Sequence, residues 1–230
     1  MVFPGNARGT PAERIARQIF KIISDSKPDL VLDLHNDWRQ SIPYTLVDPD
    51  PGFKHRQAYS RAKWFARKTG FLMVSEPGDS EDSIEWQKTL SGSLLLHGIP
   101  ALTIELGEAY IVNELLVRYG VESTWTILNY LGMTRTAGKD FQYPMPQDMK
   151  GNFLLYTQHP VSSTSGIIRF LTEPGKVVAK GQTVAKIYNT FGKLLERVQA
   201  RYEGIVLGHS DTSVAFPGSP VMSFGILKKD

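Results

Sequence analysis

Strand-like and helix-like segments alternate through the first 150 residues, and this alternation narrows the choice of fold more than any other feature. Residues 10–13, Thr-Pro-Ala-Glu, form a capping box with proline at the first helical position, which predicts a helix start. Apolar strand candidates are residues 29–35, 44–47, 71–74 and 101–105, and helical patterns cover residues 57–68, 84–96 and two further segments between 108 and 133. Strands interleaved with helices in this way are typical of an α/β sandwich.

The segment 29–35, Asp-Leu-Val-Leu-Asp-Leu-His, has aliphatic residues at both odd and even positions, so both faces of the predicted strand are apolar. Such strands are typical of parallel sheets that helices cover on both sides. The segment is therefore predicted to be a central, parallel strand.

The pattern changes near residue 150, after a polar stretch that carries two prolines. Beyond it, short strand-like runs are punctuated by glycine, without helical periodicity. Residues 166–187 resemble residues 204–226, and their leading glycines are 38 positions apart. Two copies this short cannot each bury a core, so they are predicted to interlock into one small β sandwich. We expect an α/β domain over residues 1–150 and an all-β module over residues 151–230.

Composition excludes several classes of site and partner. The chain has no cysteine, which rules out disulfides, thiolate nucleophiles and cysteine-based zinc sites. Its net charge of +3 comes without a basic run, so no nucleic-acid partner is predicted. No apolar run is long enough for a membrane span, and the first residues lack a signal-peptide pattern. The expectation is a soluble, cytoplasmic protein without a membrane partner.

His35 ends the apolar strand 29–35, at the carboxyl edge where open α/β sheets place their ligands. A neutral imidazole at this place can bind a metal. Asp33 lies two residues back on the same strand face, where its carboxylate could orient the imidazole. The alternative is a histidine that is merely hydrogen-bonded at a strand end.

Glu105 ends a second apolar strand, within Gly-Ile-Pro-Ala-Leu-Thr-Ile-Glu-Leu-Gly at residues 98–107. A carboxylate at the end of a buried strand is costly unless it is paired, bound to metal or solvated in a cleft. Beside a metal it could act as a general base on bound water. The alternative is a strand-end glutamate that caps the next helix.

Arg8 and Arg39 are candidates for holding a substrate carboxylate, the alternative being ordinary surface arginines. The remaining histidines form no metal-type pair such as His-x-x-Glu. Lys193 falls between the two repeats, where biotinyl and lipoyl carriers place their modified lysine. Its neighbours, Phe-Gly before and Leu-Leu after, differ from the Met-Lys-Met or Asp-Lys-Ala setting of those carriers, so an unmodified lysine at a hairpin tip is predicted.

Four segments together resemble the succinylglutamate desuccinylase/aspartoacylase family, a branch of the zinc carboxypeptidase-like fold. They are residues 3–16 (Phe-Pro-Gly-Asn-Ala-Arg-Gly-Thr-Pro-Ala-Glu-Arg-Ile-Ala), residues 29–35, residues 98–109 and the closing glycine-punctuated module. The resemblance implies a partial carboxypeptidase-like α/β sandwich followed by a barrel-sandwich module. It also implies that His35 is a zinc ligand and that Glu105 is the general base or acid.

By the same resemblance, two further zinc ligands of the family belong to a His-x-x-Glu motif that precedes the Phe-Pro-Gly segment, as does an Asn-Arg pair for a substrate carboxylate. The chain starts at Met1, just ahead of that segment, so a truncated N-terminus is expected. The missing part would also carry strands of the sheet, which predicts an exposed sheet edge or a contact between copies in a homo-oligomer.

Two functions follow as competing hypotheses. The first is a zinc-dependent amide hydrolase that removes an acyl group from an N-acylated amino acid or a related small molecule, with activity impaired by the absent ligands. The second is a catalytically silent remnant that acts by binding, through its β module or an apolar edge.

Overall fold

The computed structural model describes residues 2–77, 81–135, 139–209 and 212–227. The α-helices are α1 (Pro11–Ser26), α2 (Arg56–Ala66), α3 (Leu90–Leu95) and α4 (Glu114–Tyr130), and the 3-10 helices are η1 (Phe53–His55), η2 (Glu81–Lys88) and η3 (Gln147–Met149). The strands of the first part are β1 (Val31–His35), β2 (Gln40–Ser41), β3 (Tyr44–Val47), β4 (Leu72–Ser75) and β5 (Ala101–Glu105). The later strands are β6 (Phe153–Thr157), β7 (Gly166–Phe170), β8 (Val177–Val178), β9 (Thr183–Tyr188), β10 (Leu194–Gln199), β11 (Gly204–His209), β12 (Val214–Ala215) and β13 (Met222–Ile226). Among the described residues, no helix is both long and apolar enough to cross a membrane.

The larger sheet is mixed and has nine strands. Their order is β1-β5-β3-β4-β6-β13-β11-β2, with β8 beside β11. β1 and β5 are parallel to each other, and β3, β4 and β6 are parallel among themselves. The two groups run in opposite directions because β3 pairs antiparallel with β5. As a result, the carboxyl ends of β1 and β5 and the amino end of β3 lie at the same end of the strands.

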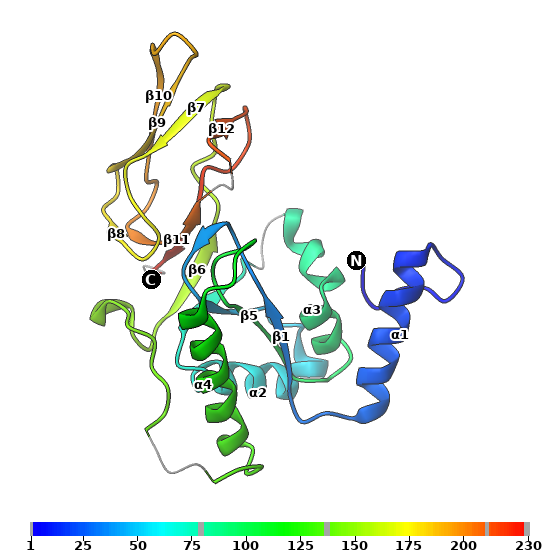
Figure 1. The fold of residues 1–230 in the computed structure, drawn as a ribbon. Helices are drawn as coiled ribbons and strands as arrows, with labels where there is room; N and C mark the ends of the chain where they lie inside the picture. Colours follow the sequence, from blue (N-terminus) through cyan, green and yellow to red (C-terminus); the bar gives the residue numbers. More distant parts are fainter. Residues whose placement is uncertain (1, 78–80, 136–138, 210–211, 228–230) are drawn as a thin grey trace.

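Helices cover both faces of the α/β part, which confirms the mixed α/β architecture (Figure 1). α2 and α4 share one apolar cluster with strand residues that include Val47 and Leu102. α1 and α3 share another cluster with Val31 and Ala101. Because side chains alternate along a strand, residues 33 and 35 and residues 103 and 105 lie on the α1–α3 side of the sheet.

The capping box at the start of α1 is confirmed. The backbone N–H of Thr10 donates to the Glu13 carboxylate at 2.8 Å, and the Glu13 N–H donates back to the Thr10 hydroxyl at 3.4 Å. The strands predicted at 44–47 and 101–105 also have the predicted bounds. Local patterns were sufficient for these elements.

The prediction that residues 29–35 form a central strand is wrong, although the predicted parallel pairing is present. In the described part of the chain, β1 pairs only with β5 and lies at one edge of the sheet. Its two apolar faces reflect helices above and below the sheet, since Val31 packs near α1 and Leu32 near α2. Leu34 is 51% exposed. An exposed sheet edge is therefore observed, while a contact between copies stays a prediction.

Two helix predictions were also wrong in detail. The single helix predicted over residues 84–96 is divided into η2 and α3, because Thr89 is extended and its hydroxyl accepts the N–H of Gly92 as a new N-cap at 3.0 Å. The two helices predicted between 108 and 133 are one helix, α4, which starts at an N-cap made by Asn113. Side-chain caps decided both boundaries.

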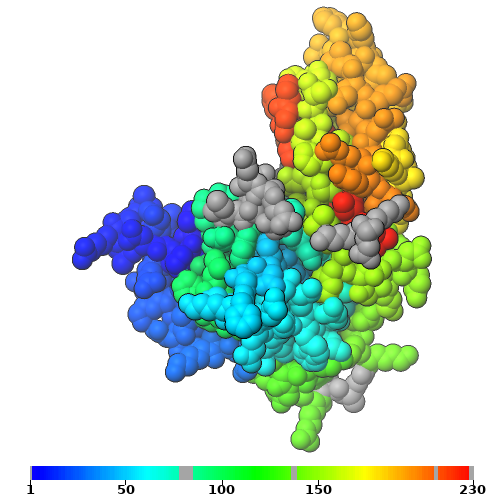
Figure 2. Space-filling model, turned by 180° about the vertical axis from the view of Figure 1, so that it is seen from behind, coloured from blue at the N-terminus to red at the C-terminus, as the bar shows by residue number. Residues whose placement is uncertain are grey.

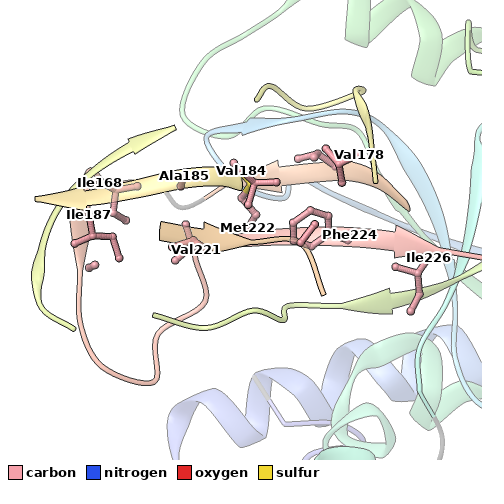
Figure 3. Close-up of a cluster of buried hydrophobic side chains, with 13 residues drawn as sticks. Ile168, Val178, Val184, Ala185, Ile187, Val221, Met222, Phe224 and Ile226 are labelled. Atoms are coloured by element: carbon pink, nitrogen blue, oxygen red, sulfur yellow. The ribbon is translucent and has the colours of Figure 1, made fainter. Parts of the chain in front are cut away.

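The β module projects from the α/β part, with the β9–β10 hairpin at its far end (Figures 1 and 2). β7, β9, β10 and β12 form a separate antiparallel sheet in the order β10-β9-β7-β12. β6, β11 and β13 instead extend the nine-stranded sheet. An apolar cluster lies between the two groups of strands, with Ile187, Val184, Met222 and Phe224 among its members (Figure 3). The domain boundary near residue 150 and the barrel-sandwich description stay predictions.

The two repeats exchange their short middle strands. β8 of the first repeat pairs with β11 of the second, and β12 of the second pairs with β7 of the first. The backbone hydrogen bonds are reciprocal as well, from Ile168 N–H to Ser213 O at 2.9 Å and from Val206 N–H to Lys176 O at 3.0 Å. Each repeat thus adds its short strand beside a strand of the other repeat, which confirms the predicted interlocking.

Candidate active site

The last residues of β1 and β5 are direct neighbours. The parallel register aligns His35 with Glu105, so both side chains leave the sheet on the same face. His35 Nδ1 lies 3.7 Å from Glu105 Oε1. The structure therefore brings together the two residues that the sequence singled out.

The imidazole of His35 lies between two carboxylates. Its other nitrogen, Nε2, is 3.1 Å from Asp33 Oδ1, and half of its side chain is exposed. The hydrogen bond to Asp33 raises the pKa of His35; partial burial opposes this shift, and the charges of Asp33 and Glu105 reinforce it. Asp33 thus lies where the sequence placed it, beside the imidazole.

Glu105 is much more buried than its partner. Its side chain is only 11% exposed, and Oε2 has no hydrogen-bond partner within the described chain. Burial raises the pKa of Glu105 to about 7; the charge of Asp37 adds to this shift, and His35 opposes it. A carboxyl group that is half ionised near neutral pH can both accept and return a proton.

Sequence reasoning missed an acidic and phenolic group around this pair. Asp37 follows β1, and Tyr44 at the start of β3 donates a hydrogen bond from its hydroxyl to Asp37 Oδ2 at 3.0 Å. Tyr44 is also aligned with Glu105 across the β3–β5 pair. Polar residues directly after His35 were a usable signal for Asp37. No local signal marks Tyr44, because its position depends on β3 running antiparallel to β5.

The β module contributes Tyr156 from β6. Burial raises the pKa of Tyr156 to about 12, with the charge of Asp37 as the next cause, so the phenol stays protonated at neutral pH. Tyr156 accepts a hydrogen bond from Gln158 at 2.9 Å. A residue more than 110 positions after Asp37 therefore belongs to the same electrostatic environment.

A cavity of about 720 Å³ is lined by Tyr156 and Glu76, whereas His35 and Glu105 do not line it. The charge of Glu76 also contributes to the raised pKa of Glu105. Trp86, Gln158 and His159 are among its other lining residues. The size lies within the usual range for small-molecule sites.

The other candidates from the sequence lie elsewhere. Arg8 is exposed, and its backbone N–H bonds to the Asn6 side chain. Arg39 lines a different cavity. Lys193 lies in the turn between β9 and β10 and is exposed, in agreement with the predicted hairpin tip.

A metal would find an incomplete set of ligands in the described residues. They contain no group of three or more His, Cys, Asp or Glu side chains placed to hold one ion. His35 and Glu105 offer an imidazole nitrogen and a carboxylate oxygen, both of which suit zinc. His35 could supply one ligand of a metal site, with the Glu105 carboxylate beside it.

Residues 2–131 match the family model described as the succinylglutamate desuccinylase/aspartoacylase catalytic domain. This match covers more than half of the chain. The chain belongs to this family. The match confirms the resemblance seen in the sequence and includes both His35 and Glu105.

Solved structures of the desuccinylase/aspartoacylase family have the same fold. The succinylglutamate desuccinylase/aspartoacylase from Rhodobacter sphaeroides is 20% identical, with a TM-score of 0.77, and the match covers 100% of this chain and 67% of that one. A succinylglutamate desuccinylase from Silicibacter sp. TM1040 is 16% identical, with a TM-score of 0.76 and coverages of 99% and 66%.

A third structure is the product-bound ectoine utilization protein EutE (DoeB) from Ruegeria pomeroyi. It is 19% identical, with a TM-score of 0.75, over 98% of this chain and 66% of that chain. The chain thus spans about two thirds of the length of these neighbours. No curated protein sequence matches it significantly.

Proposed function

We propose that the protein is a zinc-dependent deacylase that hydrolyses the amide bond of an N-acylated amino acid or a related small molecule. The observation that carries this proposal is the alignment of His35 with Glu105 at the ends of two parallel strands, with 3.7 Å between their side chains, inside a region that matches the family's catalytic domain. The product-bound neighbour supports a small-molecule substrate.

His35 would supply one zinc ligand. Nδ1 faces Glu105, while Nε2 is held by Asp33, and a carboxylate on the second nitrogen is the usual way to orient a metal-binding imidazole. When bound, zinc would polarise the amide carbonyl and acidify water. His35 is thereby a metal ligand in this proposal and Asp33 a positioning residue.

Glu105 would move the proton. Its buried carboxylate takes a proton from the attacking water and later passes it to the leaving amine, so the products are a carboxylate and a free amine. Oε1 faces the imidazole of His35 at 3.7 Å, while Oε2 is buried and has no hydrogen-bond partner within the described chain. Tyr44 and Asp37 hold the strand end beside it through their hydrogen bond.

The substrate would enter through the cavity of about 720 Å³. Tyr156 and Gln158 reach its wall from the β module, so the module would form part of the substrate pocket. Which acyl group the cavity accepts depends on the residues that line it, and these come from both parts of the chain.

A second candidate function is a binding protein without catalysis. It is favoured by one observation, the lack of a three-ligand group among the described residues. On that ground we propose that residues 1–230 by themselves bind zinc weakly, because a catalytic zinc site normally has three protein ligands and one water.

Metal analysis and hydrolysis separate the two candidates. The purified chain is dialysed against zinc, its zinc content is measured, and N-acetyl and N-succinyl amino acids are tested as substrates. The deacylase proposal expects little turnover by residues 1–230 alone. In a chain extended by the additional sequence that its longer neighbours contain, it expects turnover that is lost in His35→Ala and kept in His55→Ala, a histidine outside the site. Zinc-free protein that is inactive on every substrate, even with the additional sequence that its longer neighbours contain, would favour the binding protein.

A further inference from the structure

The outer face of the four-stranded sheet carries a row of three cations on β7, β9 and β10 (Figure 1). Arg169 on β7 pairs directly with Lys186 on β9, and Lys186 pairs on its other side with Arg197 on β10. Directly paired residues project from the same face of a sheet. The next residues along β9 and β10, Ile187 and Val198, point into the apolar cluster on the opposite face. The three cations therefore stand side by side on the solvent side of the module.

This row is electrostatically unfavourable for the chain by itself. Neighbouring strands are about 4.8 Å apart, and like charges directly opposite each other destabilise a sheet. Among the described residues, none of the three cations forms an ion pair with a carboxylate. Glu196, the neighbour of Arg197 in the chain, instead accepts hydrogen bonds from the Ser163 N–H and the Ser162 hydroxyl. An acidic partner would offset a repulsion that the described chain leaves in place.

A second row, of apolar side chains, runs beside the cations on the same face. Its members, from one edge of the sheet to the other, are Val214, Ile167, Tyr188 and Leu194, each paired with the next. Val214 is 49% exposed and Ile167 is 44% exposed. Ile167 lies two residues before Arg169, so the two rows are about 7 Å apart. The face is thus amphipathic, with one apolar row and one cationic row.

The composition of the apolar row favours a protein as the partner. Single-stranded nucleic acid is bound by exposed aromatic rings, whereas three of the four residues here are aliphatic. The ring of Tyr188 already lies beneath the guanidinium of Arg169, at 5.0 Å from its centroid. A membrane surface is bound by apolar side chains that reach below the charged ones. Here both rows stand on the same face of one sheet.

We propose that this face is a docking surface for a protein segment that carries one apolar stripe and one acidic stripe. Carboxylates of the segment would pair with Arg169, Lys186 and Arg197, and its apolar stripe would cover Ile167 and Val214. An α-helix suits the spacing, because three or four of its residues rise about 4.5–6 Å and neighbouring strands are about 4.8 Å apart. A helix lying across the strands would place an apolar and an acidic residue over each strand.

The test is titration of the whole chain with an amphipathic peptide that has leucine at helical spacing and glutamate beside each leucine. Comparison peptides have lysine in place of glutamate, or the same composition in scrambled order. Oligothymidylate and phosphatidylserine vesicles are the nucleic-acid and membrane probes. We expect saturable binding of the acidic amphipathic peptide, weakened by added salt because charge pairs contribute to it.

The combined substitutions Arg169→Gln, Lys186→Gln and Arg197→Gln should weaken this binding by about tenfold or more, because three charge-assisted contacts are lost. Ile167→Thr with Val214→Thr should weaken it by about fivefold, because less apolar area is buried. The matched control removes three cations from exposed turns of the same module, at Lys176, Lys180 and Lys193. It should stay within about twofold of the unmodified chain.

A measurement without any partner tests the repulsion itself. Lys186→Gln removes the central charge of the row, so its midpoint of urea unfolding should be higher than that of Lys193→Gln. A lower midpoint would contradict the repulsion on which the proposal rests. Absence of saturable peptide binding, equal binding of the scrambled or lysine peptide, or equal weakening by the control substitutions would overturn the proposal. Tighter binding of oligothymidylate or vesicles that depends on the same three cations would overturn it as well, whether or not the chain hydrolyses amides.

Discussion

The α/β part and the β module differ in what their interiors contain. In the α/β part, Asp48, directly after β3, and Glu105, at the end of β5, are buried carboxylic acids. In the module, no described Asp, Glu, Lys or Arg is buried, and the cluster between its strands is wholly apolar. Burying ionisable groups costs stability. The difference indicates that the α/β part keeps buried carboxylic acids that lower its stability but can take part in chemistry. The module supplies an apolar core and part of the wall of the cavity of about 720 Å³.

The two parts also differ in how their strands are completed. β1 has a neighbour on one side only within the described residues, and it is this strand that carries His35. In the module, each repeat pairs its short middle strand with the other repeat. Reciprocal pairing makes the module self-contained, whereas the strand that carries the candidate site is open to a further neighbour.

The largest effect is expected at Glu105. Its carboxylate is buried in the α/β part at a cost in stability, which we attribute to its catalytic role. Glu105→Gln keeps the shape but cannot transfer a proton, so hydrolysis should fall by roughly 10²–10⁴-fold. The free energy of unfolding should not fall, because a buried ionisable group is removed. Steady-state hydrolysis and urea unfolding check the two halves of this prediction.

Glu122→Gln is the control, since Glu122 is exposed on α4. It should leave both activity and stability unchanged. If Glu105→Gln kept its activity, the catalytic role of the buried carboxylate would be wrong.

The next effect is expected in the apolar interior of the module. Ile187 is fully buried in the cluster between the strands, so Ile187→Ala should lower the free energy of unfolding by about 2–5 kcal/mol. Leu34→Ala, on the open edge strand, should cost less than about 1 kcal/mol because Leu34 is half exposed. Urea unfolding of both variants measures the contrast. Similar losses at both positions would show that the edge strand is covered in solution.

Asp48 tests whether buried charge in the α/β part is a cost. Burial raises the pKa of Asp48 from 3.8 to about 7; the Ser91 hydroxyl opposes this shift, while the charges of Glu76 and Asp33 add to it. The folded protein therefore binds this proton more tightly than the unfolded chain does. Its contribution to stability is complete below pH 3.8 and is lost as the pH rises towards 7.

Asp48→Asn cannot ionise. Its free energy of unfolding should therefore exceed that of the unmodified chain by about 1–3 kcal/mol at pH 8 and differ little from it at pH 4. Urea unfolding at both pH values measures this dependence on pH. Asp148→Asn, at an exposed position, should show no such dependence on pH. An equal effect of Asp48→Asn at both pH values would mean that the pKa of Asp48 is the same in the folded and the unfolded chain, so that burial does not raise it.

The smallest effect is expected at Lys193, at the exposed tip of the module. Lys193→Ala should change the free energy of unfolding by less than about 0.5 kcal/mol, as is usual for surface positions. The intact mass of the unmodified chain should equal the mass calculated from its sequence. A biotinyl or lipoyl mass increment would instead assign the module a carrier role.

The sequence by itself determined the local features of this protein. The capping box at Thr10, the strands that end on His35 and Glu105, and the repeat that predicts an interlocked module all depend on residues close together in the chain. The family could be identified for the same reason, because its motifs are short segments in a characteristic order.

Only the tertiary structure decided which segments meet. The edge position of β1, the antiparallel β3 that aligns Tyr44 with Glu105, and the approach of Tyr156 from the β module depend on the order of strands in the sheet. The row formed by Arg169, Lys186 and Arg197 depends on it as well. A strand's own residues specify its two faces through their alternation, but its neighbours are selected by the packing of the whole sheet, to which every other element contributes.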